Sequence, residues 1–256
     1  MDAKLKKAIK NDPTTNRWLI ECADEGNLEG VDEALNGGAI VACYNNKAIE
    51  LAAESGSVAV VRRLFENGAK VDAQDAKAPI KAARKGHHEV VELFLDHGVK
   101  ITRQMITKAV SRTDSAVFDV MLKHPSTSST NTEMMVVIAA QARKTHWIPT
   151  NVIWQINYDQ RMVLLRWAAR SGDKQSVETC LKVTKADQSH INRALAWAAE
   201  EQQEAIMDVL LESGADLDDA IKQAQTRPTR ELLATRAPKL AIFRDSAQPA
   251  PESLFF

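Results

Sequence analysis

The sequence predicts an all-α solenoid of about seven to eight short helix pairs joined by short loops. The main evidence is a pair of adjacent small residues, which recurs at steps of 30, 30, 27, 30, 29 and 30 residues. A fixed period in this range is typical of a repeat array, in which each unit buries its apolar face against its neighbours. The positions of the glycines and of the large apolar residues support the same unit. The small pairs are Cys22-Ala23, Ala52-Ala53, Ala82-Ala83, Ala109-Val110, Ala139-Ala140, Ala168-Ala169 and Ala198-Ala199.

Eight of the ten glycines fall in two positions of this unit, four and sixteen residues after the first small residue. A chain that leaves a helix often needs a positive φ or a close backbone approach, and glycine meets both needs. The glycines therefore mark the ends of two helices in each unit. The first position holds Gly26, Gly56, Gly86 and Gly172, and the second holds Gly38, Gly68, Gly98 and Gly214.

Large apolar residues lie between the two glycine positions, at spacings i, i+1, i+4 and i+5. This spacing places them on one face of a short helix. Each unit is thus predicted to hold a first helix built on the small pair, a turn, a second helix and a connection. Small residues let neighbouring first helices approach closely, and larger ones would overpack the contact. Examples of the apolar set are Val60, Val61, Leu64 and Phe65, and then Val90, Val91, Phe94 and Leu95.

The third unit has the most informative run, A-A-R-K-G-H-H-E-V-V-E-L-F-L-D-H-G from Ala82 to Gly98. It is similar to the run A-A-x-x-G-H-x-E-V-V-x-L-L-L-x-x-G of the ankyrin repeat family, and the pattern resembles that family over about residues 16–235. The segments Asn67-Gly68-Ala69 and Ser213-Gly214-Ala215-Asp216 resemble its G-A-D segment. For most members, this resemblance implies a protein-interaction module that binds its partner on the concave face.

The units depart from the family pattern in two ways. They lack the T-P-L-H opening, to which Pro79 comes closest, and they are shorter than the family's repeat of about 33 residues. The shortfall lies where ankyrin repeats form a β-hairpin, so we expect short loops and little or no strand. The fifth unit, over residues 124–160, is predicted to be irregular, because residues 126–131 are rich in Ser and Thr and residues 146–156 fit no second helix.

The charge and the apolar content of the sequence argue against a nucleic-acid-binding protein and against a membrane protein. The 256 residues carry 33 basic and 34 acidic side chains, and a net charge of −1 provides no general attraction to nucleic acid or anionic membranes. No apolar run reaches the length of about 18 residues that would suggest a membrane span, and the N-terminus lacks the apolar core of a signal peptide. Three cysteines cannot form a disulfide framework. We therefore expect an intracellular monomer, cytoplasmic or nuclear, that binds neither nucleic acid nor membrane.

Three segments are predicted. Residues 1–15 are expected to form a polar N-terminal capping helix, residues 16–235 the ankyrin-type solenoid, and residues 236–256 a mobile C-terminal tail. The tail holds Pro238, Pro249 and Pro251 and has no helical period. Its apolar end, Leu254-Phe255-Phe256, is either a docking peptide or a frayed terminus.

Catalytic signals are absent from the sequence. The six histidines and three cysteines show no H-x-x-x-H or C-x-x-C spacing, and no G-x-S-x-G, Walker or G-x-G-x-x-G motif occurs. His87 matches the turn histidine of the family and is expected to form a structural hydrogen bond. The sequence therefore predicts no catalytic residue, no metal site and no cofactor.

One surface row suggests a binding site. In ankyrin-like units the residue just before the small pair projects onto the concave face, and this position holds Trp167 and Trp197 in consecutive units. Neighbouring helices pack about 8–10 Å apart, so the two indoles should lie side by side. Aromatic residues beside an arginine are typical of binding hot spots. The predicted partner-binding residues are Trp167, Trp197, Ile138, Arg170, Glu200 and Gln141.

The sequence leaves alternatives open. The two tryptophans could instead pack on each other or under a loop, whereas Trp147 and Trp154 either extend the aromatic surface or fill the irregular unit; Trp18 is expected to cap the N-terminal core. The first functional hypothesis is a protein-interaction adaptor. The second is a small-molecule-binding protein or enzyme that uses the groove as a pocket, with polar candidates Arg170, Glu200, His146 and Tyr158. The third is a structural or capping subunit of a larger complex.

Overall fold

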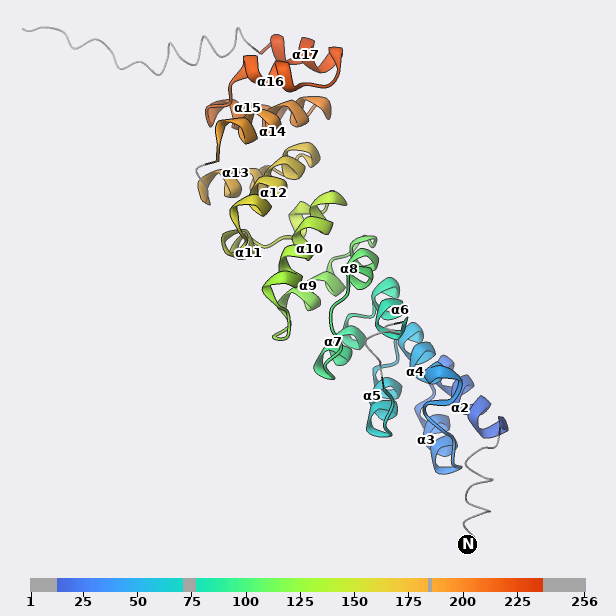
Figure 1. The fold of residues 1–256 in the computed structure, drawn as a ribbon. Helices are drawn as coiled ribbons and strands as arrows, with labels where there is room; N and C mark the ends of the chain where they lie inside the picture. The colour runs from blue at the N-terminus through green and yellow to red at the C-terminus, as the bar shows by residue number, and fades with distance from the viewer. Residues whose placement is uncertain (1–12, 71–76, 184–185, 237–256) are drawn as a thin grey trace, which may run out of the picture. The chain divides into compact units, whose positions relative to one another are not determined.

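The computed structural model describes residues 13–70, 77–183 and 186–236, and the chain divides into two compact units, residues 1–138 and 139–256. Every regular element in the described residues is helical: sixteen α-helices, in about eight repeat units, and one short 3-10 helix (Figure 1). No strand occurs within those three ranges. The predicted all-α repeat architecture is confirmed.

Within residues 13–138, the helices follow one another in pairs. The first helices of successive pairs pack together, and so do the second helices. The first helices α2, α4, α6 and α8 contact one another in order, and so do the second helices α3, α5, α7 and α9. Helix α10 begins in this unit and ends in the next. The bounds are α2 Pro13–Glu25, α3 Leu28–Asn36, α4 Cys43–Ser55, α5 Val58–Glu66, α6 Lys77–Lys85, α7 His88–Asp96, α8 Arg103–Val110, α9 Ala116–Lys123 and α10 Ser129–Gln141.

Residues 139–236 repeat this arrangement. First helices α12 and α14 pack together, and α14 packs on α16; second helices α11, α13 and α15 contact one another in order, and α17 closes the series against α16 and α14. The bounds are η1 Thr145–Trp147, α11 Thr150–Gln155, α12 Tyr158–Ser171, α13 Lys174–Val183, α14 Gln188–Glu200, α15 Glu204–Glu212, α16 Leu217–Gln223 and α17 Arg227–Ala234.

The small pairs lie in the buried core of the described helices. All seven pairs are buried, and no member is more than 3% exposed. They lie on the first helices. Where α2, α4, α6 and α8 pack on one another, and where α12 packs on α14, the small pairs place little side-chain volume between the two backbones.

Gly56 illustrates why the turn after the first helix needs glycine. It ends α4 with φ +85° and ψ 12°, and a Cβ atom there would lie 2.5 Å from Nδ1 of His87 in the following unit. The His87 ring covers this turn and donates from Nε2 to the Glu54 carbonyl oxygen at 3.0 Å. The predicted structural role of His87 is thus confirmed, and the bond ties the turn at Gly56 to the following repeat.

The irregular fifth unit is also present. Its second-helix segment is divided into η1 and the six-residue helix α11. The Ser/Thr-rich segment that suggested a loop is only partly one, because α10 already begins at Ser129. Trp147 is 9% exposed and fills this unit, whereas Trp154 is 59% exposed.

The expectation that Trp18 caps the N-terminal core is wrong, because its side chain is 43% exposed and α2 buries Leu19, Cys22 and Ala23 instead. Residues 1–12 and 237–256 lie outside the described residues, so the capping helix and the tail stay predictions; α2 begins at Pro13. Arg236 is buried and forms ion pairs with Glu204 and Asp208, so it packs with the repeats.

Enlarging a small pair should destabilise the protein. Ala82→Leu and Ala198→Leu each place a larger side chain in a fully buried helix contact, which should lower the free energy of unfolding by about 1–3 kcal/mol. Urea unfolding measures this loss. The controls are Ala59→Leu and Ala205→Leu, because both alanines are exposed; equal stability of all four variants would contradict the assigned repeat register.

The turn after the first helix should tolerate alanine poorly. Gly68 and Gly56 have nearly the same φ, +84° and +85°, but a Cβ atom on Gly68 meets no atom within 4 Å. Gly68→Ala should therefore cost only the left-handed backbone penalty, about 1 kcal/mol. Gly56→Ala must also displace the His87 ring and should cost clearly more. Thermal unfolding of the two variants provides the comparison, and equal losses would show that His87 does not close this turn.

Candidate functional site

The centre of the candidate site is a pair of tryptophans on neighbouring first helices. Trp167 lies on α12 and Trp197 on α14, each just before a buried small pair. Their ring centroids are 5.6 Å apart, with an angle of 70° between the ring planes. This edge-to-face arrangement is a favourable geometry for aromatic rings. The predicted side-by-side placement is confirmed, and both side chains are half-buried.

Two arginines of α12 hold the rings. The guanidinium carbon of Arg170 lies 5.7 Å from the centroid of each indole, and that of Arg166 lies 5.7 Å from the Trp197 ring. All three distances allow cation–π attraction. The two arginines are one helical turn apart, so Trp197 contacts the surface of α12 between them. Arg170 was predicted from its position after the small pair; Arg166 was missed, although the i to i+4 spacing from Arg170 was a usable signal.

A carboxylate fixes Arg170 in this position. Glu201 Oε1 accepts hydrogen bonds from Arg170 Nε at 2.8 Å and from Arg143 Nη2 at 2.6 Å, and Arg143 Nη1 reaches Oε2 at 3.3 Å. The hydrogen bonds from Arg170 and Arg143 lower the pKa of the Glu201 carboxyl below its ordinary value of 4.5. Glu201 is therefore ionised at neutral pH and bridges the two arginines.

Two residues within 139–236 have an unusual backbone conformation. Arg143 and Gln202 have φ +59° and +57°, and both lie four residues after the first member of a small pair, where four other units have glycine. A side chain in this region costs about 1 kcal/mol or more. Strained positions of this kind often occur at functional sites. Here a glycine at position 143 could not provide the guanidinium that contacts Glu201.

The remaining predicted residues have different surroundings. Glu200 does not flank the tryptophans as expected: its Oε1 accepts from the Gln225 backbone N–H at 3.4 Å, and the neighbouring Glu201 makes the arginine contacts instead. Gln141 is exposed at the end of α10. Ile138 is 8% exposed, so it offers little surface to a partner.

The polar residues of the pocket hypothesis do not gather at one place. Tyr158 donates its hydroxyl proton to Asp187 Oδ2 at 2.9 Å, and the exposed His146 lies against Trp147 with 6.1 Å between ring centroids. In the described ranges, no group of three or more His, Cys, Asp or Glu side chains could hold a metal ion. None of the described helices has the length and apolar character that a membrane crossing requires.

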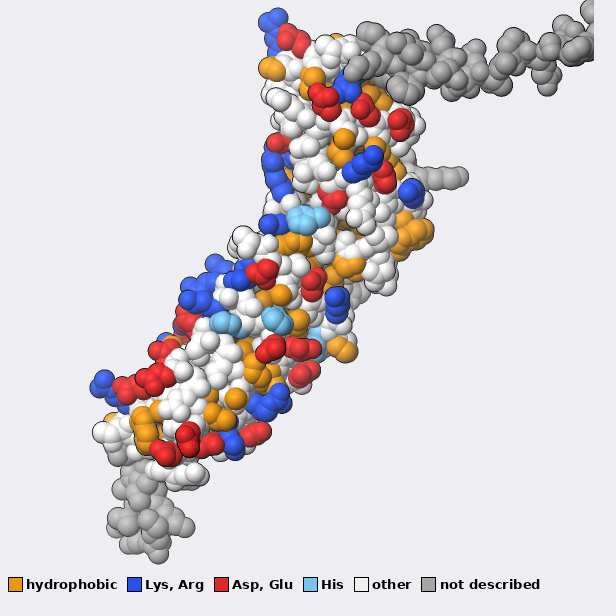
Figure 2. Space-filling view, turned by 180° about the vertical axis from the view of Figure 1, so that it is seen from behind, with side chains coloured by type: hydrophobic (Ala, Val, Ile, Leu, Met, Phe, Trp, Pro, Cys, Tyr) orange, Lys and Arg blue, Asp and Glu red, His pale blue; other side chains and the backbone are white. Residues whose placement is uncertain are grey.

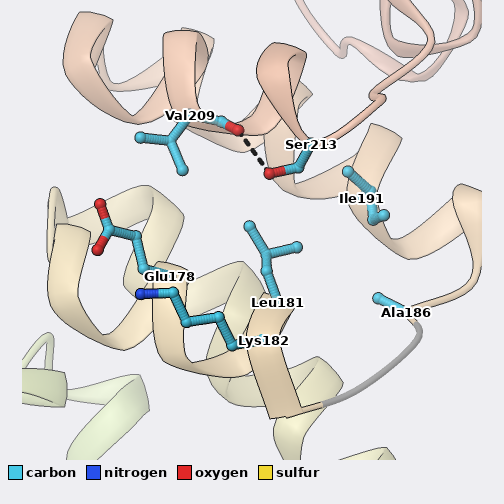
Figure 3. A pocket seen from close by; sticks show the side chains of 7 residues that line it. All are labelled: Glu178, Leu181, Lys182, Ala186, Ile191, Val209 and Ser213. Atoms are coloured by element: carbon cyan, nitrogen blue, oxygen red, sulfur yellow. Dashed lines mark hydrogen bonds between the residues drawn. The ribbon is translucent and has the colours of Figure 1, made fainter.

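A hollow of about 450 Å³ lies elsewhere, between α13 and α15 (Figure 3). Leu181, Ile191 and Val209 point into it, and Ser213 donates its hydroxyl proton to the Val209 carbonyl oxygen at 2.7 Å. Its rim carries Glu178 and Lys182. No residue predicted from the sequence lines this hollow, and it presents mainly aliphatic surface.

The Glu201 bridge should make stability depend on pH. A carboxyl with a lowered pKa stabilises the fold above its unfolded pKa, and this contribution disappears as the pH falls through the folded pKa. Relative to Glu201→Gln, the wild-type chain should be more stable by about 0.5–1 kcal/mol at pH 7. The difference should shrink below about pH 4. Urea titrations at several pH values test this. Glu200→Gln is the control, and a similar effect for both variants would contradict the bridge.

A protein-family match supports the repeat assignment in the N-terminal part of the chain. Residues 19–105 match the family model described as ankyrin repeats, in three copies. Among solved structures, the chain is similar to the crystal structure of the human ASB11 ankyrin repeat domain, with 18% identity and a TM-score of 0.46; the match covers 91% of this chain and 99% of that one. No curated protein sequence matches. The family match assigns ankyrin repeats to residues 19–105.

Proposed function

We propose that this ankyrin-repeat protein is a non-catalytic interaction module, and that its protein partner binds the first-helix face of residues 139–236 at Trp167 and Trp197. Ankyrin repeats typically bind proteins. The observation that carries the proposal is the half-buried tryptophan pair with arginines against its rings. Trp and Arg are the residue types enriched at binding hot spots.

The arrangement is already ordered, which favours tight binding. Immobilising a flexible side chain in an interface costs about 0.5–1.5 kcal/mol. Arg170 is held by Glu201 and by both indoles, and Trp197 is held between Arg166 and Arg170. A partner would therefore meet side chains whose conformations are set before binding.

The charge distribution favours a protein over a nucleic acid as partner. Acidic and basic side chains are interspersed on the face drawn in Figure 2, with small islands of hydrophobic side chains between them. The face in that view lacks the broad basic field that nucleic-acid binding uses. The net charge of −1 supports the same conclusion.

We place the protein inside the cell, as a monomer in the cytoplasm or nucleus. Its three cysteines are free, and burial raises the pKa of the Cys180 thiol to about 12. A thiol of this kind behaves as a small apolar group. Free cysteines in a repeat core suit a reducing compartment.

Truncating the tryptophans should abolish most of the binding. Trp167→Ala and Trp197→Ala should each weaken binding to the partner by about 2 kcal/mol or more, roughly 30-fold. The partner is first recovered by affinity purification on the wild-type chain and then titrated, once purified, against each variant. Circular dichroism checks that the helical fold remains.

Two controls complete the experiment. Trp154→Ala removes an exposed tryptophan of the same unit, and Leu51→Ala changes the equivalent first-helix position of another repeat. Both should bind with nearly wild-type affinity. Normal binding by the Trp167 and Trp197 variants would refute the site, and loss of their fold would assign the rings to the core.

A further inference from the structure

The arginines around the tryptophan pair differ in their partners. Arg143 and Arg170 share the carboxylate of Glu201. Arg166 donates from Nε to the Met162 carbonyl oxygen at 3.2 Å and lies over Trp197, but no described acidic side chain is within ion-pair distance of it. Arg193, one helical turn before Trp197 on α14, likewise lacks a described acidic partner and is exposed.

The two unpaired arginines influence each other. Burial and the charge of Arg193 both lower the pKa of the Arg166 guanidinium, so this half-buried cation has a like charge nearby and no counter-ion among the described side chains. Removing a charge from water is costly unless an opposite charge or hydrogen bonds compensate. An anion placed between Arg166 and Arg193 would provide that compensation.

Helices α4 and α6 show the opposite case, in which basic side chains are paired with carboxylates. There Lys81 on α6 contacts Glu50 at 2.7 Å and Glu54 at 2.6 Å on α4, and Arg84 contacts Glu54 at 2.7 Å. Lys81 and Arg84 are therefore neutralised by carboxylates of the preceding first helix. Beside the tryptophans, no described carboxylate takes this role for Arg166.

The ring contacts limit what a partner can place there. Arg166 and Arg170 already lie against the Trp197 ring, and Arg170 against Trp167. A cationic group of the partner would have to displace these guanidiniums and would be repelled by Arg193. Apolar side chains can use the exposed parts of the indoles without such conflict, and a carboxylate would be attracted.

From this charge pattern, we propose that the partner is a protein segment with an Asp or Glu side chain that pairs with Arg166 and Arg193, next to an apolar side chain on Trp167 and Trp197. The inference rests on the proposed function and adds the chemistry of the segment. Guanidinium groups favour carboxylates because several charge-assisted hydrogen bonds can form at once. The pairing should raise the association rate and specify the register of the segment.

Selection from random peptides displayed on phage tests the inference on the full chain. Peptides that bind the wild-type chain and lose binding to Trp197→Ala should carry Asp or Glu at a constant distance from Leu, Phe or Met. A synthetic peptide from this set should bind about tenfold or more weakly when its acidic residue is changed to the amide. This second measurement requires no change in the protein, so folding of a variant cannot confuse it.

A double-mutant cycle locates the charge. In the Arg166→Gln/Arg193→Gln variant, the same change in the peptide should alter the dissociation constant less than about twofold. The control variant Arg62→Gln/Lys100→Gln removes two exposed charges elsewhere and should keep the full tenfold effect. Because exposed charges are screened by salt, binding of the acidic peptide should also weaken as ionic strength rises.

The outcomes separate the two proposals. Peptides that require Trp197 but bind equally well with acid or amide would overturn the acidic segment and leave the proposed function intact. An acidic preference that persists in the Arg166→Gln/Arg193→Gln variant would also overturn it. If no selected peptide depends on Trp197, both the interaction site and its acidic specificity fail.

Discussion

The close contact between first helices, made possible by the small pairs, is the constraint on which the rest of this protein depends. Each pair is buried, and its spacing determines where the next helix begins along the chain. Since every unit contacts mainly its neighbours, one rule repeated along the sequence is enough to build the array. The turns then follow from it, because a chain leaving such a tight contact must reverse within a few residues, as at Gly56 under the His87 ring.

The same contact creates the candidate site. A residue just before a small pair lies at the edge of the helix–helix contact, where a large side chain is partly covered and partly open. With tryptophan at this position in two consecutive units, the rings meet edge to face, and the arginines of α12 complete the cluster. The aromatic surface is thus a consequence of the repeat, with different side chains at one of its positions.

Residues 139–236 also show how a repeat gains specificity by departing from its own pattern. Arg143 and Gln202 replace glycine where the backbone is left-handed, at some cost in stability, and Glu201 precedes one of them. The result is a carboxylate that holds two arginines on one side of the tryptophans, whereas Arg166 and Arg193 have no such partner in the part of the chain that the structure describes. The two sides of the tryptophan pair therefore differ in charge, which a row of identical repeats would not show.

Periodicity alone was enough to predict the helix pairs, the turns and the meeting of Trp167 with Trp197, because these depend on spacing and on contacts between adjacent units. It could not predict that Glu201 rather than Glu200 contacts Arg170, or that Arg143 joins them, because a difference of one residue depends on how α14 ends and on the turn after α10. Nor could it show that Trp147 is buried and Trp18 exposed. Those outcomes are decided by tertiary packing, which chooses among side-chain positions that the repeat pattern treats as equivalent.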